Sequence, residues 1–532
     1  MTAPSLSSGP TDVALLDETI GACLRRIARQ HPDREALVVV HQGVRLTYAG
    51  LDHQVDRVAR GLHTAGLRKG DRLAIWAPSC AEWTLVQYAT ARLGIVLVTV
   101  NPAYRSHELA HVLRQSTSRM LVCAASFKTS DYVAMVEQVR SDLVALKQVV
   151  VLGTPDWDAL LLDEGDLPEG DLHPDDPINI QYTSGTTGFP KGATLSHRNI
   201  VNNGFFVGLL CGYTEQDRIA VPVPFYHCFG MVMGVLGALT HGACVVVPGP
   251  SFEPTATLQA VQDERCTALY GVPTMFIAEL ADSGFSSYDL SSLRTGIMAG
   301  SPCPVEVMKR VVAEMHMREV TICYGMTETS PVSTQTRADD DLERRVSTVG
   351  RVHPQVTVKV VDPVTGKTVP RGATGELCTA GYGVMIGYWE DPAKTAEAID
   401  PDGFMHTGDL AVMDAEGYLS IVGRIKDLII RGGENVYPRE VEEFLFTHPD
   451  VAEVQVVGVP DGRYGEELCA WVRLRPGAVM TQDDVRDFCR DRLAHYKVPR
   501  YVRFTDSFPM TVTGKVQKYL MREQSAAELG LV

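Results

Sequence analysis

The sequence lacks the features of a disulfide-stabilised or nucleic-acid-binding protein. Its 12 cysteines are scattered singly from Cys23 to Cys489 with no CxxC pair, which indicates reduced thiols, most of them small core residues. The formal net charge of −16 argues against a nucleic-acid groove, because such binding relies on clustered lysine and arginine. The chain of 532 residues is longer than one hydrophobic core supports, so we expect at least two domains.

Targeting and membrane signals are also missing. The start, MTAPSLSSGPTDV, has neither the basic and apolar regions of a signal peptide nor the pattern of a transit peptide. The longest apolar run, residues 228–240, is shorter than the roughly 20 residues that a membrane span needs, and it predicts a buried helix. We therefore expect a cytoplasmic protein with no integral membrane segment and no nucleic-acid partner.

Apolar runs of strand length alternate with helical patterns in the first part of the chain. The strand-like runs cover residues 73–77, 95–100, 120–125 and 148–152, and a helical pattern covers residues 48–66. Such alternation predicts an α/β protein with parallel sheets that are covered by helices.

The pattern changes towards the carboxyl end. Short strands with glycine turns from about 355 to 423 predict a small β-barrel or antiparallel subdomain. The last hundred or so residues predict a compact α+β unit, with helices over 437–448 and 481–496 and strands over 453–459 and 467–475. We therefore expect two domains, residues 1–423 and 424–532.

A glycine- and hydroxyl-rich loop, YTSGTTGFPKG from residue 182 to 192, lies between a predicted strand and a predicted helix. Alternation turns Ile178, Ile180 and Tyr182 inward on the strand, and Ser196 is the expected N-cap of the helix. Glycines let backbone N–H groups approach an anion, and Lys191 adds a positive charge. The loop is not a Walker A sequence, because Pro190 precedes the lysine. A solvated turn would explain such a loop equally well if it stood alone, but its density of donors favours phosphate.

Four further motifs follow in the chain: YGMTE (324–328), TGD (407–409), GRIKDLIIRGGENVYP (423–438) and TVTGK (511–515). Together with the loop they resemble, in content and order, the adenylate-forming (AMP-binding) enzyme family, over nearly the whole chain. The resemblance implies a large N-terminal domain of two parallel-sheet α/β subdomains plus a small β-barrel, and a small mobile α+β C-terminal domain with its hinge near Lys426. It also implies an AMP-forming acid–thiol ligase that uses ATP, Mg²⁺ and, as acyl acceptor, CoA.

The resemblance assigns a nucleotide site residue by residue. Glu328 and the hydroxyl of Thr183 resemble the metal contacts, Tyr324 resembles the residue that packs against adenine, and Asp409 resembles the carboxylate that accepts the ribose hydroxyls. Lys515 is expected to reach the α-phosphate and the acyl carboxylate as charge develops, with Thr327, Glu328 and Lys191 as further catalytic residues. The remaining expected ATP or AMP contacts are Ser184, Gly185, Thr186, Thr187, Gly188, Gly300, Ser301, Pro302 and Arg424.

The acyl substrate is indicated mainly by what the sequence omits. Peptide-synthetase members of the family place an aspartate near the front of the acyl pocket to pair with the ammonium of an amino acid, whereas residues 222–240 here contain no acidic side chain. The resemblance therefore disfavours an amino acid as substrate. Gly325 stands where acetate-type enzymes close the pocket with tryptophan, so a deeper apolar pocket is expected. Its predicted walls are His227, Phe229, Met231, Gly325 and Met326. The resemblance places the path of the CoA thiol along Gly432, Gly433 and Glu434.

Several longer stretches, among them LYGVPTMF and SSYDLSSLRTGIMAGSPCP, resemble the medium-chain acyl-CoA synthetase branch typified by acyl-CoA synthetase family member 2. That branch carries a mitochondrial targeting segment in animals, whereas this chain begins almost directly at the domain, which favours a cytoplasmic enzyme. A homodimer is a family-level expectation. Three alternatives stay open: a fatty acyl-AMP ligase that loads a carrier protein, an aryl-CoA or luciferase-like enzyme, and a nucleotide-binding protein without turnover.

Overall fold

The computed structural model describes residues 3–168, 171–183, 190–490, 492–511 and 516–531. They form two compact units, which are treated separately below. The larger unit comprises Ser7–Val358 and Thr379–His406, and the smaller unit comprises Met1–Leu6, Lys359–Cys378 and Thr407–Val532. The domain boundary expected after residue 423 stays a prediction.

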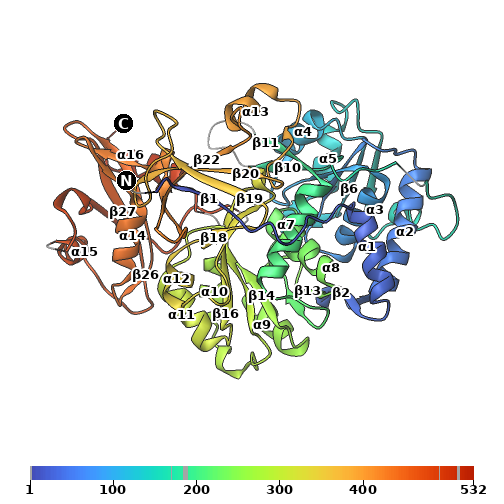
Figure 1. Ribbon diagram of the computed structural model, residues 1–532, viewed down its shortest axis with the longest axis horizontal. Helices are drawn as coiled ribbons and strands as arrows, with labels where there is room; N and C mark the ends of the chain where they lie inside the picture. The colour runs from blue at the N-terminus through green and yellow to red at the C-terminus, as the bar shows by residue number, and fades with distance from the viewer. Residues whose placement is uncertain (1–2, 169–170, 184–189, 491, 512–515, 532) are drawn as a thin grey trace. The chain divides into compact units, whose positions relative to one another are not determined.

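The first sheet of the larger unit has seven strands (Figure 1). In spatial order they are β21 (Gly387–Tyr388), β11 (Lys191–Ser196), β10 (Pro177–Thr183), β5 (Val96–Thr99), β4 (Arg72–Trp76), β6 (Met120–Cys123) and β9 (Gln148–Val151). The run from β10 to β9 is parallel, and β11 and β21 are antiparallel additions. The four strands predicted from the apolar runs are therefore confirmed within a residue or two.

Both faces of this sheet are buried. Leu73 and Ile75 of β4 belong to one hydrophobic core, and Ala74 and Trp76 belong to the core on the other face. Burial on both faces is what a central parallel strand requires, and it explains why β4 reads as a continuous apolar run. The second face is covered by α4 (Ser106–Gln115) and α5 (Tyr132–Arg140).

A second sheet of nine strands completes the larger unit. Its order is β18 (Arg351–Val352), β17 (Val332–Gln335), β16 (Glu319–Gly325), β15 (Thr295–Ala299), β14 (Ala268–Gly271), β12 (Arg218–Ala220), β13 (Cys244–Val247), β2 (Glu35–Val39) and β3 (Val44–Thr47). The strands from β16 to β2 are parallel and the outer strands are antiparallel. Figure 1 shows α9, α10 and α11 gathered along this sheet. The expected α/β class with two mainly parallel sheets is confirmed.

The helices of the larger unit include the two predicted with most detail. Helix α7 (His197–Leu210) begins at the expected N-cap, where the Ser196 hydroxyl accepts from the N–H of Asn199. The apolar run 228–240 forms a π-helix, η2 (Phe229–Leu236), continued by α8 (Gly237–His241), and it is buried throughout. The other helices are α1 (Ile20–Gln30), η1 (Val40–Gln42), α2 (Tyr48–Thr64), α3 (Ala81–Leu93), α6 (Pro155–Asp158), α9 (Pro254–Asp263), α10 (Pro273–Leu280), η3 (Phe285–Ser287), α11 (Val305–Glu314), η4 (Thr327–Thr329), α12 (Leu342–Ser347) and α13 (Pro392–Ala398), and a short hairpin joins β7 (Ser126–Phe127) to β8 (Ser130–Asp131).

The barrel expected between residues 355 and 423 does not close. The region forms a five-stranded sheet in the order β1 (Leu6–Ser8), β19 (Val356–Val361), β20 (Thr374–Gly381), β22 (Met405–Met413) and β23 (Leu419–Arg424). Within the described residues its end strands, β1 and β23, do not pair with each other. A barrel requires that pairing, and β1 is only three residues long, so the sheet stays open.

The carboxyl-terminal part of the smaller unit is the expected α+β arrangement. Its sheet contains β25 (Glu434–Val436), β24 (Ile429–Arg431), β27 (Gly465–Leu474), β26 (Val451–Asp461) and β28 (Tyr501–Phe504). The helices are η5 (Ile425–Asp427), α14 (Pro438–Phe446), α15 (Gln482–Cys489), η6 (His495–Lys497) and α16 (Lys518–Glu528). Helix α15 stops well before the predicted residue 496, where η6 replaces its last turn.

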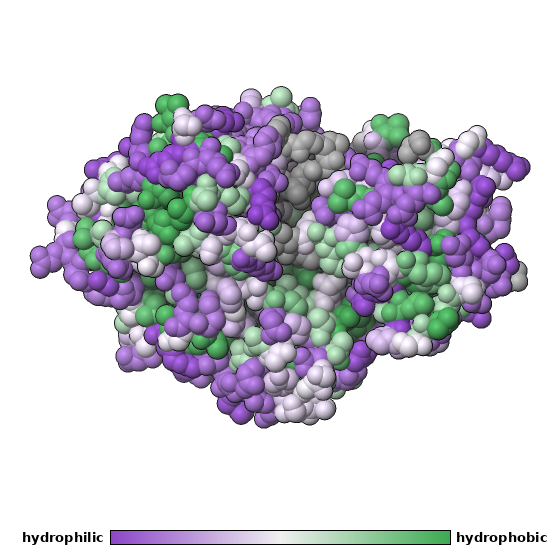
Figure 2. All heavy atoms as spheres, turned by 180° about the vertical axis from the view of Figure 1, so that it is seen from behind, coloured by the Kyte–Doolittle hydropathy of each residue, from purple (hydrophilic) through white to green (hydrophobic). Residues whose placement is uncertain are grey.

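The state of the cysteines is as the composition predicts. All 12 cysteines are buried free thiols. Among the described residues, no helix has the length and apolar character needed to cross a membrane. Figure 2 shows hydrophilic residues over most of the face drawn, with hydrophobic residues in separate small groups.

Candidate functional site

The predicted site residues of the larger unit gather at the carboxyl ends of strands. Thr183 is the last residue of β10, Gly300 follows β15, and Tyr324 and Gly325 end β16. In open α/β sheets, ligands bind at this end of the strands. Sequence motifs separated by more than a hundred residues are therefore brought to equivalent positions of the two sheets.

Glu328, the predicted metal contact, is buried and is held by a residue that the motifs did not include. The hydroxyl of Tyr388 donates to Oε1 of Glu328 over 2.9 Å, and the carboxylate is 5% exposed. Lys191 places its ammonium nitrogen 4.8 Å from the centre of the same tyrosine ring. Tyr388 therefore joins Lys191, which ends the loop, to Glu328 of the YGMTE motif.

The electrostatics of this cluster follow from its partners. Burial, followed by the neighbouring Glu328 carboxylate, raises the pKa of Tyr388 above its usual value, so its phenol stays protonated and donates. A neutral donor satisfies one carboxylate oxygen without cancelling its charge. The Lys191 ammonium interacts with the face of the ring as a cation–π pair. A negative oxygen and a cation are thus both held in place near the loop.

The loop itself is described only at its two ends. Thr183 pairs with Lys191 across the antiparallel β10–β11 ladder, and its hydroxyl donates to the Lys191 carbonyl over 3.4 Å. This pairing closes the loop and confirms that it begins at the end of a strand. Predicted contacts at Ser184, Gly185, Thr186, Thr187 and Gly188 lie outside the described residues.

The other predicted contacts in the larger unit occupy the end of β16 and the turns that follow β15 and β16. Tyr324 is half-buried, and Thr327 is buried in the 3₁₀ turn η4, which also carries Glu328. Gly300 has a φ of 91° and lies with Ser301 and Pro302 in the turn between β15 and α11. The structure therefore places all of them at or just beyond the carboxyl ends of β15 and β16.

The predicted acyl-pocket residues have two different settings. Phe229 and Met231 are buried in η2, and Phe229 stacks on Tyr270 of β14 with ring centres 5.6 Å apart. The half-buried His227 accepts from the N–H of Phe229 at Nδ1 over 3.2 Å. An accepting Nδ1 places the proton of the neutral ring on Nε2. The ring is therefore oriented by the first turn of the helix that carries the other pocket residues.

The packing of the backbone gives a second reason for glycine at position 325, besides the pocket depth that the sequence suggested. A Cβ atom at this position would lie 1.8 Å from the carbonyl oxygen of Pro331, at the irregular pairing of β16 with β17. No side chain fits there unless the backbone moves. Met326, the next residue, is partly buried and packs against the main core of the larger unit. The glycine is thus required by the close approach of two backbone segments, whatever the depth of the pocket.

In the smaller unit, the structure brings Asp409 and Arg424 together. They face each other in the register of β22 and β23, and the Arg424 Nε donates to Oδ1 of Asp409 over 2.9 Å. The carboxylate is buried, and the Thr407 hydroxyl accepts from the N–H of Asp409. The predicted ribose-binding carboxylate therefore has its predicted arginine neighbour.

The proposed CoA path follows a tight hairpin. Gly432 and Gly433 form the turn between β24 and β25 with φ values of 60° and 89°, a conformation that favours glycine. The N–H of Gly432 donates to the Tyr464 carbonyl over 2.8 Å, and a Cβ there would meet the Tyr464 ring at 3.1 Å. Glu434 is exposed at the start of β25. Lys426 is exposed in η5, and its role as hinge stays a prediction, while Lys515 lies outside the described residues.

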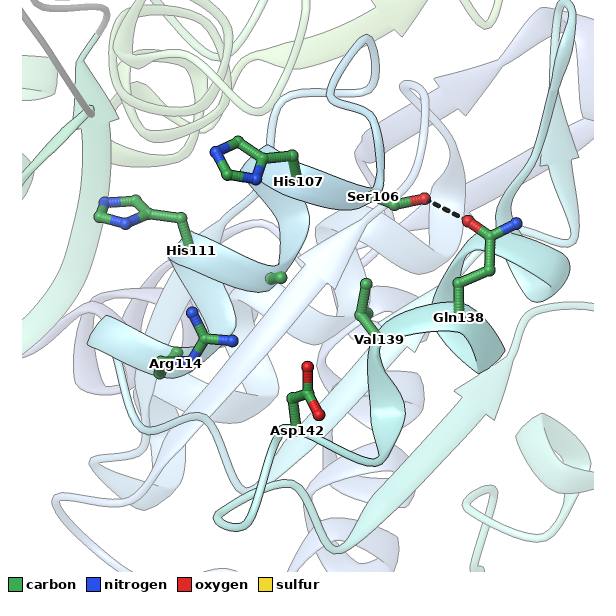
Figure 3. Close-up of a pocket in the computed structure, with 8 residues that line it drawn as sticks. Ser106, His107, His111, Arg114, Gln138, Val139 and Asp142 are labelled. Atoms are coloured by element: carbon green, nitrogen blue, oxygen red, sulfur yellow. Dashed lines mark hydrogen bonds between the residues drawn. The ribbon is translucent and has the colours of Figure 1, made fainter.

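A separate hollow of about 490 Å³ lies between α4 and α5. Figure 3 shows His107, His111 and Arg114 along one side of α4, with the Ser106 hydroxyl donating to Oε1 of Gln138 over 2.7 Å. None of the predicted site residues lines it. His111 lies 3.3 Å from the carbonyl oxygen of Pro190, so α4 lies beside the end of the loop.

Comparison with known proteins decides the family. Residues 24–389 match the model of the AMP-binding enzyme, and residues 440–515 match the AMP-binding enzyme C-terminal domain. This chain belongs to the AMP-binding enzyme family. The adenylate-forming family, predicted from motifs, and the α/β class, predicted from the alternation of strand and helix patterns, are therefore confirmed, and so is the enzyme class, an AMP-forming acid–thiol ligase.

Relatives of this AMP-binding enzyme match over nearly its whole length. YngI of Bacillus subtilis (strain 168) is 48% identical, with 96% of this chain and 98% of that protein covered. The mitochondrial medium-chain acyl-CoA ligase ACSF2 of Danio rerio is 46% identical, with 99% and 91% covered. Among solved structures, the anthranilate CoA ligase AuaEII with anthranoyl-AMP has a TM-score of 0.89 at 26% identity, with 97% and 99% covered. ATP-bound MatB from Rhodopseudomonas palustris has a TM-score of 0.86 at 32% identity, with 95% and 99% covered.

Sequence reasoning missed two buried polar residues of this enzyme. Tyr388 lies in GYWED, which was not among the motifs considered, and only the folded chain places it on Glu328. Gln181 lies on β10 between Ile180 and Tyr182. The alternating pattern had predicted that these two neighbours, and not Gln181, point inward. The structure buries Gln181 as well, because both faces of β10 are covered. A polar residue inside a run expected to be central in a parallel sheet is the signal that was available.

Proposed function

We propose that this enzyme is an acyl-CoA synthetase for medium-chain fatty acids. The observation that carries the proposal is the buried Glu328 carboxylate, held by the neutral Tyr388 beside Lys191. Its relatives at 42–46% identity named medium-chain acyl-CoA ligase support the acid class. The apolar residues Phe229 and Met231 in η2 fit an aliphatic chain, since each buried methylene contributes about 0.8 kcal/mol.

The proposed reaction has two steps. The acid carboxylate attacks the α-phosphorus of ATP, an acyl–oxygen–phosphorus linkage forms, the bond from the α-phosphorus to the bridging oxygen of the β-phosphate breaks, and pyrophosphate leaves. The CoA thiol then attacks the acyl carbonyl carbon, loses its proton, and displaces AMP. In the first step Lys191 holds positive charge at the end of the phosphate loop, and Lys515 is proposed to neutralise the charge that develops at the α-phosphate. Asp409 and Arg424 are proposed to bind the ribose.

The residues present fit a magnesium ion. Mg²⁺ binds hard oxygen ligands and keeps several of its waters, so one or two protein oxygens suffice. Glu328 offers a carboxylate whose described partner is a neutral phenol, and Thr183 offers a hydroxyl oxygen at the end of β10. When bound, the ion would neutralise phosphate charge. The structure's own contribution is to hold Glu328 in one orientation through Tyr388.

The test is a product assay with a ladder of acids. The protein is incubated with Mg²⁺, ATP, CoA and straight-chain acids, benzoate and amino acids, and acyl-CoA, acyl-AMP and AMP are measured by mass. Acyl-CoA that peaks at middle chain lengths is the expected result. Acyl-AMP that never passes to CoA would point to a carrier-protein acceptor, and turnover of benzoate in preference would point to an aryl-CoA ligase.

A Lys515→Ala variant tests the catalytic assignment in the same assay. We expect it to lose acyl-AMP formation and to keep thioester formation from supplied acyl-AMP. Equal loss of both half-reactions would contradict the role assigned to Lys515. A cytoplasmic location and a homodimer stay predictions from the sequence and the family.

A further inference from the structure

Gln181 is a buried amide whose two ends contact sulfur atoms. It is 2% exposed on β10, two residues before Thr183. Its Nε2 lies 2.8 Å from the Met231 Sδ, and its Oε1 accepts from the Cys228 thiol over 2.8 Å. A thioether is a weak acceptor and a thiol is a weak donor. Burying an amide against such partners is unfavourable compared with an apolar side chain, so the amide calls for a functional explanation.

The two sulfur contacts enclose one residue of the proposed acyl site. Cys228 precedes η2, and Met231 lies in its first turn, so the contacts flank Phe229 in the chain. The Phe229 ring stacks on Tyr270 of β14, and its N–H binds His227. Gln181 therefore links the turn that carries the predicted acyl-site residues to β10, the strand that leads into the glycine- and hydroxyl-rich loop.

Other buried side chains hold η2 in a different way. The Gln87 amide of α3 donates to the backbone carbonyl of Met231 over 3.3 Å, and the Tyr270 hydroxyl donates to the carbonyl of Met233 over 3.3 Å. Both act on the backbone. Among these three polar side chains, Gln181 alone forms a hydrogen bond with a side chain of η2, whereas the Tyr270 ring contacts Phe229 by stacking. Because a methionine side chain is flexible, this hydrogen bond restricts where the Met231 thioether lies.

We infer that Gln181 is a positioning residue that sets acyl chain-length specificity by fixing Met231 and the turn around Phe229. The inference rests on the proposed function, because it assigns the depth of the same acyl site. The π-helical form of η2 agrees with it, since π-helical segments are rare and, where they occur, often lie at functional sites. Without the amide, the Met231 side chain adopts further rotamers, so the part of the acyl-site wall that Met231 forms is no longer fixed.

The test compares two glutamines. Gln181→Met removes the amide at similar size, and Gln87→Met is the matched control, because Gln87 is equally buried and bonds to the same Met231 through its backbone. The readout is the ratio of kcat/KM for dodecanoate to that for octanoate, which does not depend on the fraction of folded enzyme. We expect Gln181→Met to raise the ratio roughly tenfold, the size of effect that one methylene has in an apolar pocket. The control should leave the ratio within twofold.

An unchanged ratio in Gln181→Met, or an equal change in Gln87→Met, overturns the inference. If Gln181→Met does not fold, Met231→Leu removes the sulfur contact from the other side and should raise the ratio in the same direction. Where both single variants fold, the double variant should add nothing to either, because the two residues act as one unit. Failure of the proposed function is a different outcome, namely that the wild-type protein forms acyl-AMP from none of the acids.

Discussion

Two carboxylates of the predicted nucleotide and metal site are held in opposite ways. Glu328 in the larger unit is buried and accepts from a neutral phenol, that of Tyr388. Asp409 in the smaller unit is also buried but accepts from a cation, Arg424, whose side chain is 61% exposed. The same chemical group thus has an uncharged partner in one unit and a charged partner in the other.

This difference agrees with the different roles proposed for the two carboxylates. The charge of Glu328 is not cancelled by its donor, so it stays available to a cation such as Mg²⁺. The charge of Asp409 is balanced by a solvent-facing arginine, an arrangement that is worth little in the free protein and that ribose hydroxyls can share or replace. The partner of a buried acid, more than the acid itself, indicates which ligand it takes.

The largest effect is expected from Glu328→Gln. The amide oxygen still accepts from Tyr388, but the negative charge is gone. Acid-dependent pyrophosphate release should fall about 100- to 1,000-fold, the range found when one preorganised electrostatic group is removed. The magnesium concentration for half-maximal rate should rise, and the measurement is a Mg²⁺ titration of pyrophosphate release. Tyr388→Phe is the matched control, because it keeps the charge and removes only the donor, so it should lose far less. Equal losses in the two variants would mean that the charge of Glu328 is not used.

The next effect is expected from Asp409→Asn. An amide offers one acceptor oxygen in place of two, and it carries no charge, so the KM for ATP should rise about 10- to 100-fold, corresponding to about 1.5–3 kcal/mol for hydrogen bonds to a charged group. The kcat at saturating ATP should change much less. Initial rates over a range of ATP concentrations provide the measurement.

Asp414→Asn is the control for that variant. Asp414 accepts from the backbone N–H groups of Glu416 and Tyr418 in the turn between β22 and β23. The same substitution there should lower thermal stability and leave the KM for ATP unchanged. A similar rise in KM for both variants would show that the hairpin, not the carboxylate of Asp409, governs ATP binding.

A third carboxylate extends the comparison, because it has neither kind of partner. Glu279 of α10 is 1% exposed, and no described residue hydrogen-bonds to either of its oxygens. Burial raises the pKa of this carboxyl well above its ordinary value of 4.5. Folding therefore takes up a proton at pH values above 4.5, so this group makes the protein less stable as the pH rises from 4.5 towards the folded pKa.

Glu279→Met should remove that penalty. The free energy of unfolding at pH 7 should increase by roughly 1–3 kcal/mol, because a buried group without a partner is replaced by an apolar one of similar size. The gain should shrink as the pH is lowered towards 4.5. Urea unfolding at several pH values provides the measurement, and a variant less stable than the wild type at neutral pH would show that Glu279 has a favourable role.

The smallest effect is expected at the glycine hairpin of the smaller unit. Gly432→Ala must accept a positive φ and a contact with the Tyr464 ring, whereas Gly433→Ala meets the same kind of strain with no atom within 4 Å of the new Cβ. Each should lose about 1 kcal/mol of stability from the backbone alone. If the hairpin lines the CoA path, Gly432→Ala should also slow thioester formation from supplied acyl-AMP several-fold more than Gly433→Ala. Identical rates of thioester formation in the two variants would show that the contact with the Tyr464 ring does not affect this step.

Much of this protein follows from short-range patterns. The apolar runs predicted β4, β5 and β6 because central parallel strands are buried on both faces, and a further apolar run predicted β9 at the edge of the same sheet. Ser196 predicted the start of α7 because its hydroxyl satisfies an N–H group at the helix end. Five motifs in order predicted the family, and the loop that begins after Thr183 was predicted to lie between a strand and a helix, as it does, with β11 before the helix.

Long-range packing decided the rest. The sequence does not show that Tyr388 donates to Glu328, that Gln181 contacts Met231, or that Gly325 is required by the Pro331 carbonyl, because each pair belongs to different segments of the chain. Nor does it show whether five short strands close into a barrel, because closure depends on whether the two end strands meet. The sequence alone therefore determines the chemical types of the site residues. The partners that orient each residue and set its electrostatic surroundings are determined only by the tertiary structure.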